Sequence, residues 1–429
     1  NSIIKNNKDQ IFKEIWTDND DGERIFLMKA TTDNEEGSMV ANSIFENKMN
    51  HQLPNTSFAV LYRTNAQSRS IEEALRKLNI PYRIYGGLSF YNRKEIRDLL
   101  AYFRLCVNHN DEEALRRIIN YPTRGIGKTS QERIIVAADK AGTTQWAVLE
   151  EPHKYALNLN SGTLNRISAF TTMIKSFTAQ VKQKNAYEVA RLIASSSGII
   201  KELREDSTPE GISRLENIEE LLNAIRDYSE RETEMVPGQE DKEGETSLRT
   251  LDLFLQEVAL ITDADTRDKD DADKVSLMTI HSAKGLEFPY VYVVGMEENL
   301  FPSIQSLNSR TDLEEERRLF YVALTRAEQR LYLSFAENRY RWGNLTICEP
   351  SRFIEEIDKT FLEFPRRARE QATVEGNGFQ SPAGKPTIKN LKKVNTSAHE
   401  TSAGFPFDKG MAEKIQPGVE VEHSRFGKG

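Results

Sequence analysis

The feature that most constrains the fold is a set of five apolar runs typical of β-strands, which fall into two groups. They lie at residues 25–30, 57–62, 275–280, 290–295 and 331–335. Residues 291–294 are almost wholly apolar, which is typical of a parallel strand buried on both faces. Helical patterns at 35–48 and 71–78 alternate with the first runs. Alternating strands and helices predict an α/β layered lobe with a parallel sheet.

The interval between the two groups of runs is different, because it contains only helical patterns. These cover residues 94–106, 111–120, 129–140, 164–182, 186–197, 211–230 and 251–261. A helical block of this size is best explained as a separate domain inserted into the α/β lobe. We therefore expect the first part of the lobe at 1–90, the inserted all-helical domain at 91–273 and the second part at 274–365.

The composition changes again after residue 365. Residues 366–403 are rich in Lys, Arg, Asn, Ser, Thr, Gly and Pro and predict a disordered linker. Residues 404–429 end in an alternation of apolar and polar residues, which predicts the start of a small β-barrel module.

The composition of the chain argues against a membrane-spanning protein and against one held together by a structural metal. No apolar stretch approaches the roughly 20 residues that a membrane helix needs, so no membrane contact is expected. The two cysteines, Cys106 and Cys348, lack metal-ligand spacing, which predicts a reducing cytoplasm and no bound structural metal. The net charge of −8 argues against a nucleic-acid binder, but acidic runs at 230–234, 240–245 and 263–273 dominate that total.

A polar segment follows the apolar run at 275–280. Together with Thr279 near the end of the run, it supplies hydroxyls, an imidazole, an ammonium group, a flexible glycine and a carboxylate, the segment's own groups being at His281, Ser282, Lys284, Gly285 and Glu287. Ligands of open α/β sheets bind beyond the carboxyl ends of the strands. Hydroxyls and lysine suit the phosphates of a nucleic-acid backbone, and a carboxylate suits ribose hydroxyls. The segment is a candidate ligand site, and the alternative is a polar loop without such a role.

Residues 313–327 have a strongly helical pattern in which Leu319, Val322 and Ala323 form an apolar stripe. Arg326 is at i+7 from Leu319, a spacing that returns to the same face of a helix, and is therefore expected to continue the stripe. A guanidinium on a mostly buried face needs an anionic partner. On spacing alone, that partner is either a carboxylate of the same lobe or a phosphate in a cleft between lobes.

The sequence Gly125-Ile126-Gly127-Lys128-Thr129 ends like the phosphate loop of an ATPase. In a true phosphate loop the first glycine would stand at position 122, which is a proline here, and the residues before Pro122 have a helical pattern. We therefore reject residues 125–129 as an ATP site. A Gly-x-Gly turn that opens a helix still presents N–H groups to a phosphate. With Arg124 and Lys128 beside it, the turn is expected either to contact a DNA backbone or to be only a tight turn between helices.

Several long strings resemble the C-terminal motifs of superfamily 1A DNA helicases of the UvrD/PcrA/Rep group, in order and in spacing. They are residues 61–69, 85–87, 279–288, 295–298 and 321–327. The resemblance covers nearly all of residues 1–365, whereas nuclease-linked helicases share only two of these motifs. It implies a RecA-like parallel-sheet lobe (2A) interrupted by a helical domain (2B), followed by the start of a Tudor-like module that contacts RNA polymerase.

The resemblance also implies residue roles. Arg326 corresponds to an arginine finger that reaches the γ-phosphate of ATP, which is bound with Mg²⁺ mainly by another lobe. Glu287, with Gly285, corresponds to the ribose contact. Contacts with single-stranded DNA are implied for Arg63, Asn65, Thr279, His281, Ser282, Lys284 and the base-stacking Trp342, which lies in a basic, turn-like segment. Contacts with duplex DNA are implied for Arg124, Gly125, Gly127, Lys128 and Thr129.

The chain contains no phosphate loop, no Asp-Glu metal box and no adenine-stacking motif, which in the resembling family belong to a first lobe N-terminal to this region. The whole protein is therefore expected to be an ATP-dependent 3′→5′ DNA helicase of repair or replication, and this chain alone is expected not to hydrolyse ATP. One alternative is a non-catalytic DNA-binding or RNA-polymerase-docking module, against which the presence of Arg326 and Glu287 argues. Another is a nuclease-linked helicase, against which the linker and barrel-like tail argue.

Overall fold

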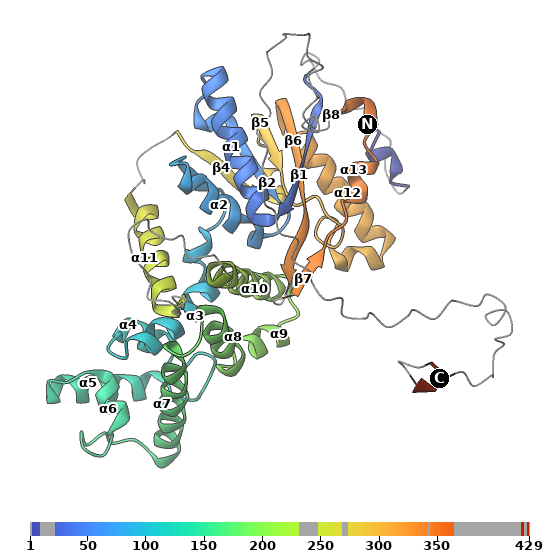
Figure 1. Ribbon diagram of the computed structural model, residues 1–429. Coiled ribbons are helices and arrows are strands. Elements are labelled where there is room, and N and C mark those ends of the chain that lie inside the picture. The colour runs from blue at the N-terminus through green and yellow to red at the C-terminus, as the bar shows by residue number, and fades with distance from the viewer. Residues whose placement is uncertain are drawn as a thin grey trace, which may run out of the picture. The chain divides into compact units, whose positions relative to one another are not determined.

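A computed structural model describes residues 2–8, 22–230, 248–267, 273–341, 344–363, 422–423 and 427–428. The chain separates into two compact units, Asn1–Ala368 and Arg369–Gly429. The first unit contains a sheet flanked by helices and a block made only of helices (Figure 1).

The described strands of the first unit form one sheet. They are β1 (Ile25–Thr32), β2 (Phe58–Tyr62), β3 (Tyr82–Ile84), β4 (Val275–Thr279), β5 (Phe288–Val293), β6 (Ala327–Arg341), β7 (Asn344–Ile347) and β8 (Leu362–Glu363). Their order is β3-β4-β2-β5-β6-β1-β8, with parallel pairing throughout, and β7 pairs antiparallel with β6. The five predicted strands are all present. The unpredicted β3, β7 and β8 are too short or too exposed to give an apolar run.

Helices cover both faces of the sheet (Figure 1). On one face, α1 (Asp33–His51) and α2 (Ser68–Lys77) pack against Val60, Leu277 and Tyr292. On the other, α12 (Arg310–Leu324) and α13 (Arg352–Glu355) pack against Leu61, Met278 and Val293. Because successive side chains of a strand point to opposite faces, β2 supplies both cores and all five of its residues are buried.

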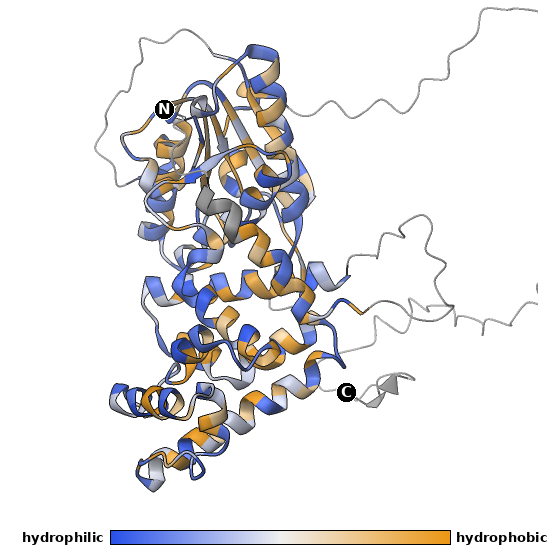
Figure 2. Ribbon diagram, turned by 90° about the vertical axis from the view of Figure 1, so that its left-hand side faces the viewer, coloured by the Kyte–Doolittle hydropathy of each residue, from blue (hydrophilic) through white to orange (hydrophobic). Residues whose placement is uncertain are grey.

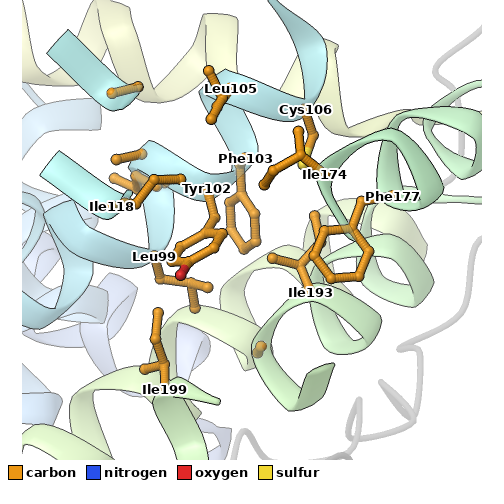
Figure 3. Close-up of a cluster of buried hydrophobic side chains, with 14 of the residues drawn as sticks. Leu99, Tyr102, Phe103, Leu105, Cys106, Ile118, Ile174, Phe177, Ile193 and Ile199 are labelled. Atoms are coloured by element: carbon orange, nitrogen blue, oxygen red, sulfur yellow. The ribbon is translucent and has the colours of Figure 1, made fainter. Parts of the chain in front are cut away.

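The helical block has a hydrophobic core of its own. Its helices are α3 (Lys94–Val107), α4 (Glu112–Ile118), α5 (Lys128–Ala141), α6 (Gln145–Glu150), α7 (Ser161–Val181), α8 (Ala186–Ser196), α9 (Ile199–Glu205), α10 (Pro209–Glu230) and α11 (Leu251–Arg267). The side chains of α3 lie at its centre, with Phe103 facing Ile174, Phe177 and Ile193 (Figure 3). Hydrophobic and hydrophilic residues alternate around these helices (Figure 2). The short helices α6 and α9 were not predicted.

These features confirm the predicted fold class, a RecA-like parallel-sheet lobe interrupted by an all-helical insertion. In the second unit, β9 (Glu422–His423) pairs antiparallel with β10 (Gly427–Lys428). The predicted linker at 366–403 and the rest of the predicted tail module lie outside the described residues. Within the described part of the chain, every helix is too short or too polar to cross a membrane.

Candidate functional site

Residues far apart in the sequence meet where β2 and β4 end. The two strands are parallel neighbours, with Tyr62 opposite Thr279. The polar residues that follow them therefore share the carboxyl edge of the sheet, where open α/β sheets bind ligands. We call these residues, Arg63, Asn65, Thr279, His281 and Ser282, the carboxyl-edge cluster.

The β4 side of this cluster is held by local capping. Thr279 precedes the 3₁₀ segment η5 (Ile280–Ala283), and its Oγ1 accepts a hydrogen bond from the Ser282 N–H at 3.3 Å. The two hydroxyl oxygens lie 3.0 Å apart. Partial burial of the ring, with the nearby Arg63 guanidinium, lowers the pKa of His281. The imidazole is therefore neutral at pH 7 and able both to donate and to accept a hydrogen bond.

The β2 side depends on two residues that were not predicted from the sequence. Glu316 of α12 accepts from Arg63 Nε at 3.1 Å and from Arg63 Nη2 at 2.7 Å, so the guanidinium is anchored within the lobe. The Gln67 side chain accepts from the backbone N–H groups of Arg63 and Thr64, at 2.9 and 2.8 Å. Gln67 had a sequence signal, because Thr64-x-x-Gln67 is a capping-box pattern. The contact between Arg63 and Glu316 joins residues that are 253 positions apart, and no signal in the sequence indicated it.

The polar segment after β4 does not stay at the carboxyl edge, which corrects the prediction for it. Phe288 pairs with Ala327, so β5 and β6 begin together at the amino edge of the sheet. Because β5 runs parallel to β4, residues 280–287 must return along the length of the sheet. Gly285, Glu287 and Arg326 consequently lie at the amino edge, and we call them the amino-edge cluster. Lys284 lies in the returning segment and is exposed.

Arg326 is positioned by neutral acceptors. Helix α12 ends at Leu324, so Arg326 lies beyond the helix and does not continue its apolar stripe as predicted. Its Nε donates to Val322 O at 3.1 Å, its Nη1 to Leu286 O at 2.8 Å and its Nη2 to Thr325 Oγ1 at 3.0 Å. The side chain is 15% exposed, and Glu287, at 3.8 Å, is itself 59% exposed.

Other buried arginines of the chain are neutralised much more closely. Arg69 Nε lies 2.5 Å from Glu220, Arg339 Nε lies 2.6 Å from Glu297, and Arg317 Nε lies 2.7 Å from Glu356. A guanidinium has five N–H donors, and the three bonds of Arg326 leave two for a further acceptor. The amino-edge cluster thus presents an ordered cation whose nearest acid is neither hydrogen-bonded to it nor buried.

The Gly-x-Gly turn joins α4 to α5, so no strand precedes it. Gly125 has φ +74°, a conformation that favours glycine, whereas Gly127 has φ −70° and is the N-cap of α5. A Cβ added at Gly127 would meet nothing within 4 Å, so the fold itself does not require glycine there. Gly127, Lys128 and Thr129 are all exposed at the start of α5.

Arg124 differs from Lys128, because its side chain is directed into the helical block. Its Nη1 donates to the carbonyls of Ile118 and Pro122, both at 3.1 Å. Its Nη2 donates to Tyr102 Oη at 2.5 Å and to Ser197 O at 2.9 Å. With four acceptors inside the block, Arg124 holds the turn in place and is not presented at the surface as predicted.

Trp342 lies outside the described residues. In the sequence it stands between the end of β6 at Arg341 and the start of β7 at Asn344. The residues that the structure describes contain no group of three or more His, Cys, Asp or Glu side chains arranged to hold a metal ion.

The parallel sheet and the all-helical insertion define the fold of the chain as a RecA-like lobe with an inserted helical domain. The chain belongs to the family of the UvrD-like helicase C-terminal domain, whose model matches residues 1–338. This confirms the resemblance seen in the motifs.

Relatives named ATP-dependent DNA helicase PcrA align with the whole chain. The protein of Staphylococcus aureus (strain NCTC 8325 / PS 47) is 36% identical over 431 residues, which are 55% of its length. Those of Bacillus subtilis (strain 168) and Leuconostoc citreum are 35% and 33% identical over 434 and 436 residues, 56% of each. The chain therefore spans about half the length of the curated relatives it matches.

Proposed function

We propose that this chain supplies the second motor lobe (2A) and the duplex-binding insertion (2B) of an ATP-dependent DNA helicase that moves 3′→5′ in DNA repair or replication. The observation that carries the proposal is the environment of Arg326, a guanidinium held by three neutral acceptors without a hydrogen-bonded acid. The relatives named as ATP-dependent DNA helicases support it.

The amino-edge cluster fits a nucleotide that is held mainly by another lobe. The free N–H donors of Arg326 suit a terminal phosphate, and an arginine supplied across a cleft stabilises charge during phosphoryl transfer. The exposed carboxylate of Glu287 suits ribose hydroxyls. Gly285 has φ +87°, and a Cβ there would meet nothing within 4 Å, so the backbone is open to close approach. ATP with Mg²⁺ would supply the phosphoanhydride bond whose cleavage drives movement.

The carboxyl-edge cluster fits single-stranded DNA. The hydroxyls of Thr279 and Ser282 and the neutral His281 suit phosphate and sugar oxygens, as does Lys284, which is exposed in the adjoining returning segment. Arg63 and Asn65 line the same edge after β2. Residues 280–287 join the two clusters directly, because the carbonyl of Leu286 accepts from Arg326 while Thr279 caps η5. A displacement of Arg326 toward a phosphate would therefore pull on the segment that contacts DNA.

Directional unwinding tests the proposal. The chain combined with its nucleotide-holding lobe should unwind a duplex with a 3′ single-stranded tail in the presence of ATP and Mg²⁺, and should unwind one with a 5′ tail far more slowly. Equal unwinding of both substrates would contradict the polarity. DNA binding without any ATP-dependent unwinding would favour the non-catalytic alternative. The contact of the tail with RNA polymerase stays a prediction.

Gly127→Asp is expected to weaken duplex binding about tenfold at fixed salt while changing single-strand binding little, because a carboxylate at the start of α5 would repel a phosphate. The fold tolerates the change sterically. Gly162→Asp is the matched control, since it adds the same charge in the exposed first turn of α7, where an added Cβ makes only ordinary contact. Fluorescence anisotropy with duplex and single-stranded oligonucleotides measures both affinities. Equal losses on the two DNAs would assign the Gly-x-Gly turn a purely structural role.

A further inference from the structure

A pocket of about 440 Å³ lies between the sheet lobe and the helical insertion. Asn65, Gly86 and Gly87 line it from the sheet lobe, and the first residues of α3 and α10 line it from the insertion. Asn65 belongs to the carboxyl-edge cluster. A Cβ added at Gly86 would lie 3.4 Å from the hydroxyl oxygen of Ser282, which belongs to the same cluster. The pocket therefore adjoins the surface that fits single-stranded DNA.

Arg93 lines this pocket and is a buried cation that forms no ion pair with any described residue. It is only 7% exposed. Its Nη1 donates to Asn217 Oδ1 and its Nη2 to Ser68 Oγ, both at 3.3 Å, which is slightly longer than usual for such bonds. Its Nε has no hydrogen-bond partner within the part of the chain that the structure describes. Because an unpaired charge is costly to bury, Arg93 points to an anion that these residues do not supply.

The acids that lie near Arg93 are bound to other groups. Glu72 pairs with Arg76 at 3.3 Å, and Glu95 Oε1 accepts from Asn217 Nδ2 at 2.6 Å. Burial lowers the pKa of Arg93, because these acids compensate its charge only in part. The guanidinium is still charged at pH 7, since the ordinary pKa of arginine is above about 12.

Two more exposed cations line the same pocket. Lys94 begins α3, and its ammonium group shares Asp98 with Arg117. Arg214 of α10 is 47% exposed, and Asp206 lies 3.7 Å from it, too far for a hydrogen bond. No side chain of the described residues caps the start of α3, so its first backbone N–H groups are further donors. Cationic and backbone donors thus gather around Arg93.

The charges that line the pocket suit a single phosphodiester group. Its cations are Arg93, Lys94 and Arg214, and its acids are Glu95 and Glu210. Three positive charges against two negative ones leave room for one more negative charge, which is the charge of one backbone phosphate. A strand that lies along the carboxyl-edge cluster would continue into this pocket, so a phosphate of the strand fits it better than a free anion.

We propose that this pocket is a backbone-phosphate site for single-stranded DNA, with Arg93 and Arg214 as its principal donors. The inference rests on the proposed function, in which the strand lies along the carboxyl-edge cluster. Because Asn65 and Gly86 belong to the sheet lobe and Arg214 to α10, one phosphate would be held by both parts of the chain. The grip on the single strand would then depend on the placement of the helical insertion.

The test uses Arg93→Gln and Arg214→Gln, made separately in the 429-residue chain. Each should weaken oligothymidylate binding about fivefold at fixed salt, from the loss of one charged donor to a phosphate. Each should also reduce the slope of log affinity against log salt concentration by about 0.7, the value for one phosphate contact with a single strand. Fluorescence anisotropy at several salt concentrations measures both quantities. The matched control is Arg116→Gln, which removes an exposed α4 arginine paired with Glu112 at 3.0 Å and should leave both unchanged.

Urea unfolding separates ligand binding by Arg93 from a structural role. A buried cation without an ion pair costs stability, so Arg93→Gln should leave the unfolding midpoint unchanged or raise it. A lower midpoint together with an unchanged salt slope would assign Arg93 a structural role and overturn the site. Arg214 is exposed, so its variant reports on binding whatever the effect of the change at Arg93.

An uncharged backbone linkage locates the phosphate. One methylphosphonate is moved, a linkage at a time, along the shortest oligothymidylate that binds with full affinity. At one position it should weaken binding to the unsubstituted chain about fivefold but cause no further loss in Arg93→Gln. Equal losses in both proteins at every linkage would overturn the site.

Failure of this inference is distinguishable from failure of the proposed function. If the unsubstituted chain does not bind oligothymidylate, the proposed function and the phosphate site fail together. If it binds, and both arginine variants keep its affinity and its salt slope, the phosphate site alone fails.

Discussion

Replacing Arg326 by alanine is expected to lower DNA-stimulated ATP hydrolysis by about 10³-fold or more, in the protein that combines this chain with its nucleotide-holding lobe. The guanidinium is already ordered by Val322, Leu286 and Thr325, so little reorganisation is needed before it meets a phosphate. Single-stranded DNA affinity should stay within about threefold, because the carboxyl-edge cluster lies at the other edge of the sheet. Steady-state ATPase assays and anisotropy titrations measure the two quantities.

Arg330→Ala is the matched control for this prediction. Arg330 lies in β6, is 22% exposed and pairs with Glu23 at 2.9 Å, so its loss should leave ATP hydrolysis nearly unchanged. Arg326→Lys should recover only part of the activity, because lysine lacks the planar, forked donors of arginine. An alanine variant with near-normal turnover and an unchanged unfolding midpoint would rule out the role of Arg326 as a trans-lobe cation.

Glu297→Ala is expected to destabilise the sheet lobe by about 3–5 kcal/mol, because it leaves the buried Arg339 poorly compensated. Glu297 is completely buried and accepts from Arg339 Nε at 2.6 Å and from the Ala336 N–H at 2.7 Å. The remaining acid, Glu36, is a weaker counter-ion, since burial raises its pKa. Both the ion pair and the backbone hydrogen bond would be lost together.

Urea unfolding followed by circular dichroism measures this loss, provided that the slope of the transition is unchanged. Glu337→Ala is the comparison, because the Lys29–Glu337 pair is 54% and 44% exposed and should contribute less than about 1 kcal/mol. If the two variants lost equal stability, Glu297 and Arg339 would not form an energetically important buried pair.

The sequence was sufficient for the five apolar strands and for the helical character of the insertion, because both depend on local patterns. Apolar runs such as residues 291–294 predict buried strands without any knowledge of their neighbours. Strand direction is not local, and this explains the error at residues 280–287. Only the parallel pairing of β2 with both β4 and β5 shows that this segment returns along the sheet and takes Glu287 to the amino edge.

Side-chain partners across long stretches of sequence were also beyond prediction. Nothing in the local pattern indicates that Arg63 is anchored by Glu316, or that Arg124 turns toward Tyr102 and the carbonyl of Ser197. The end of α12 at Leu324 likewise follows from tertiary packing and places Arg326 beyond the helix. The sequence supplied candidate residues for the site, whereas the orientation of their side chains required the fold.

The most direct test of the central claim is a crystal structure of the chain with its nucleotide-holding lobe, a non-hydrolysable ATP analogue and single-stranded DNA. We expect the Arg326 guanidinium to lie within hydrogen-bonding distance of the terminal phosphate, with Glu287 at the ribose. An Arg326 side chain that remains on Leu286 and Thr325, with the nucleotide fully bound and no contact to its phosphates, would contradict the proposed role.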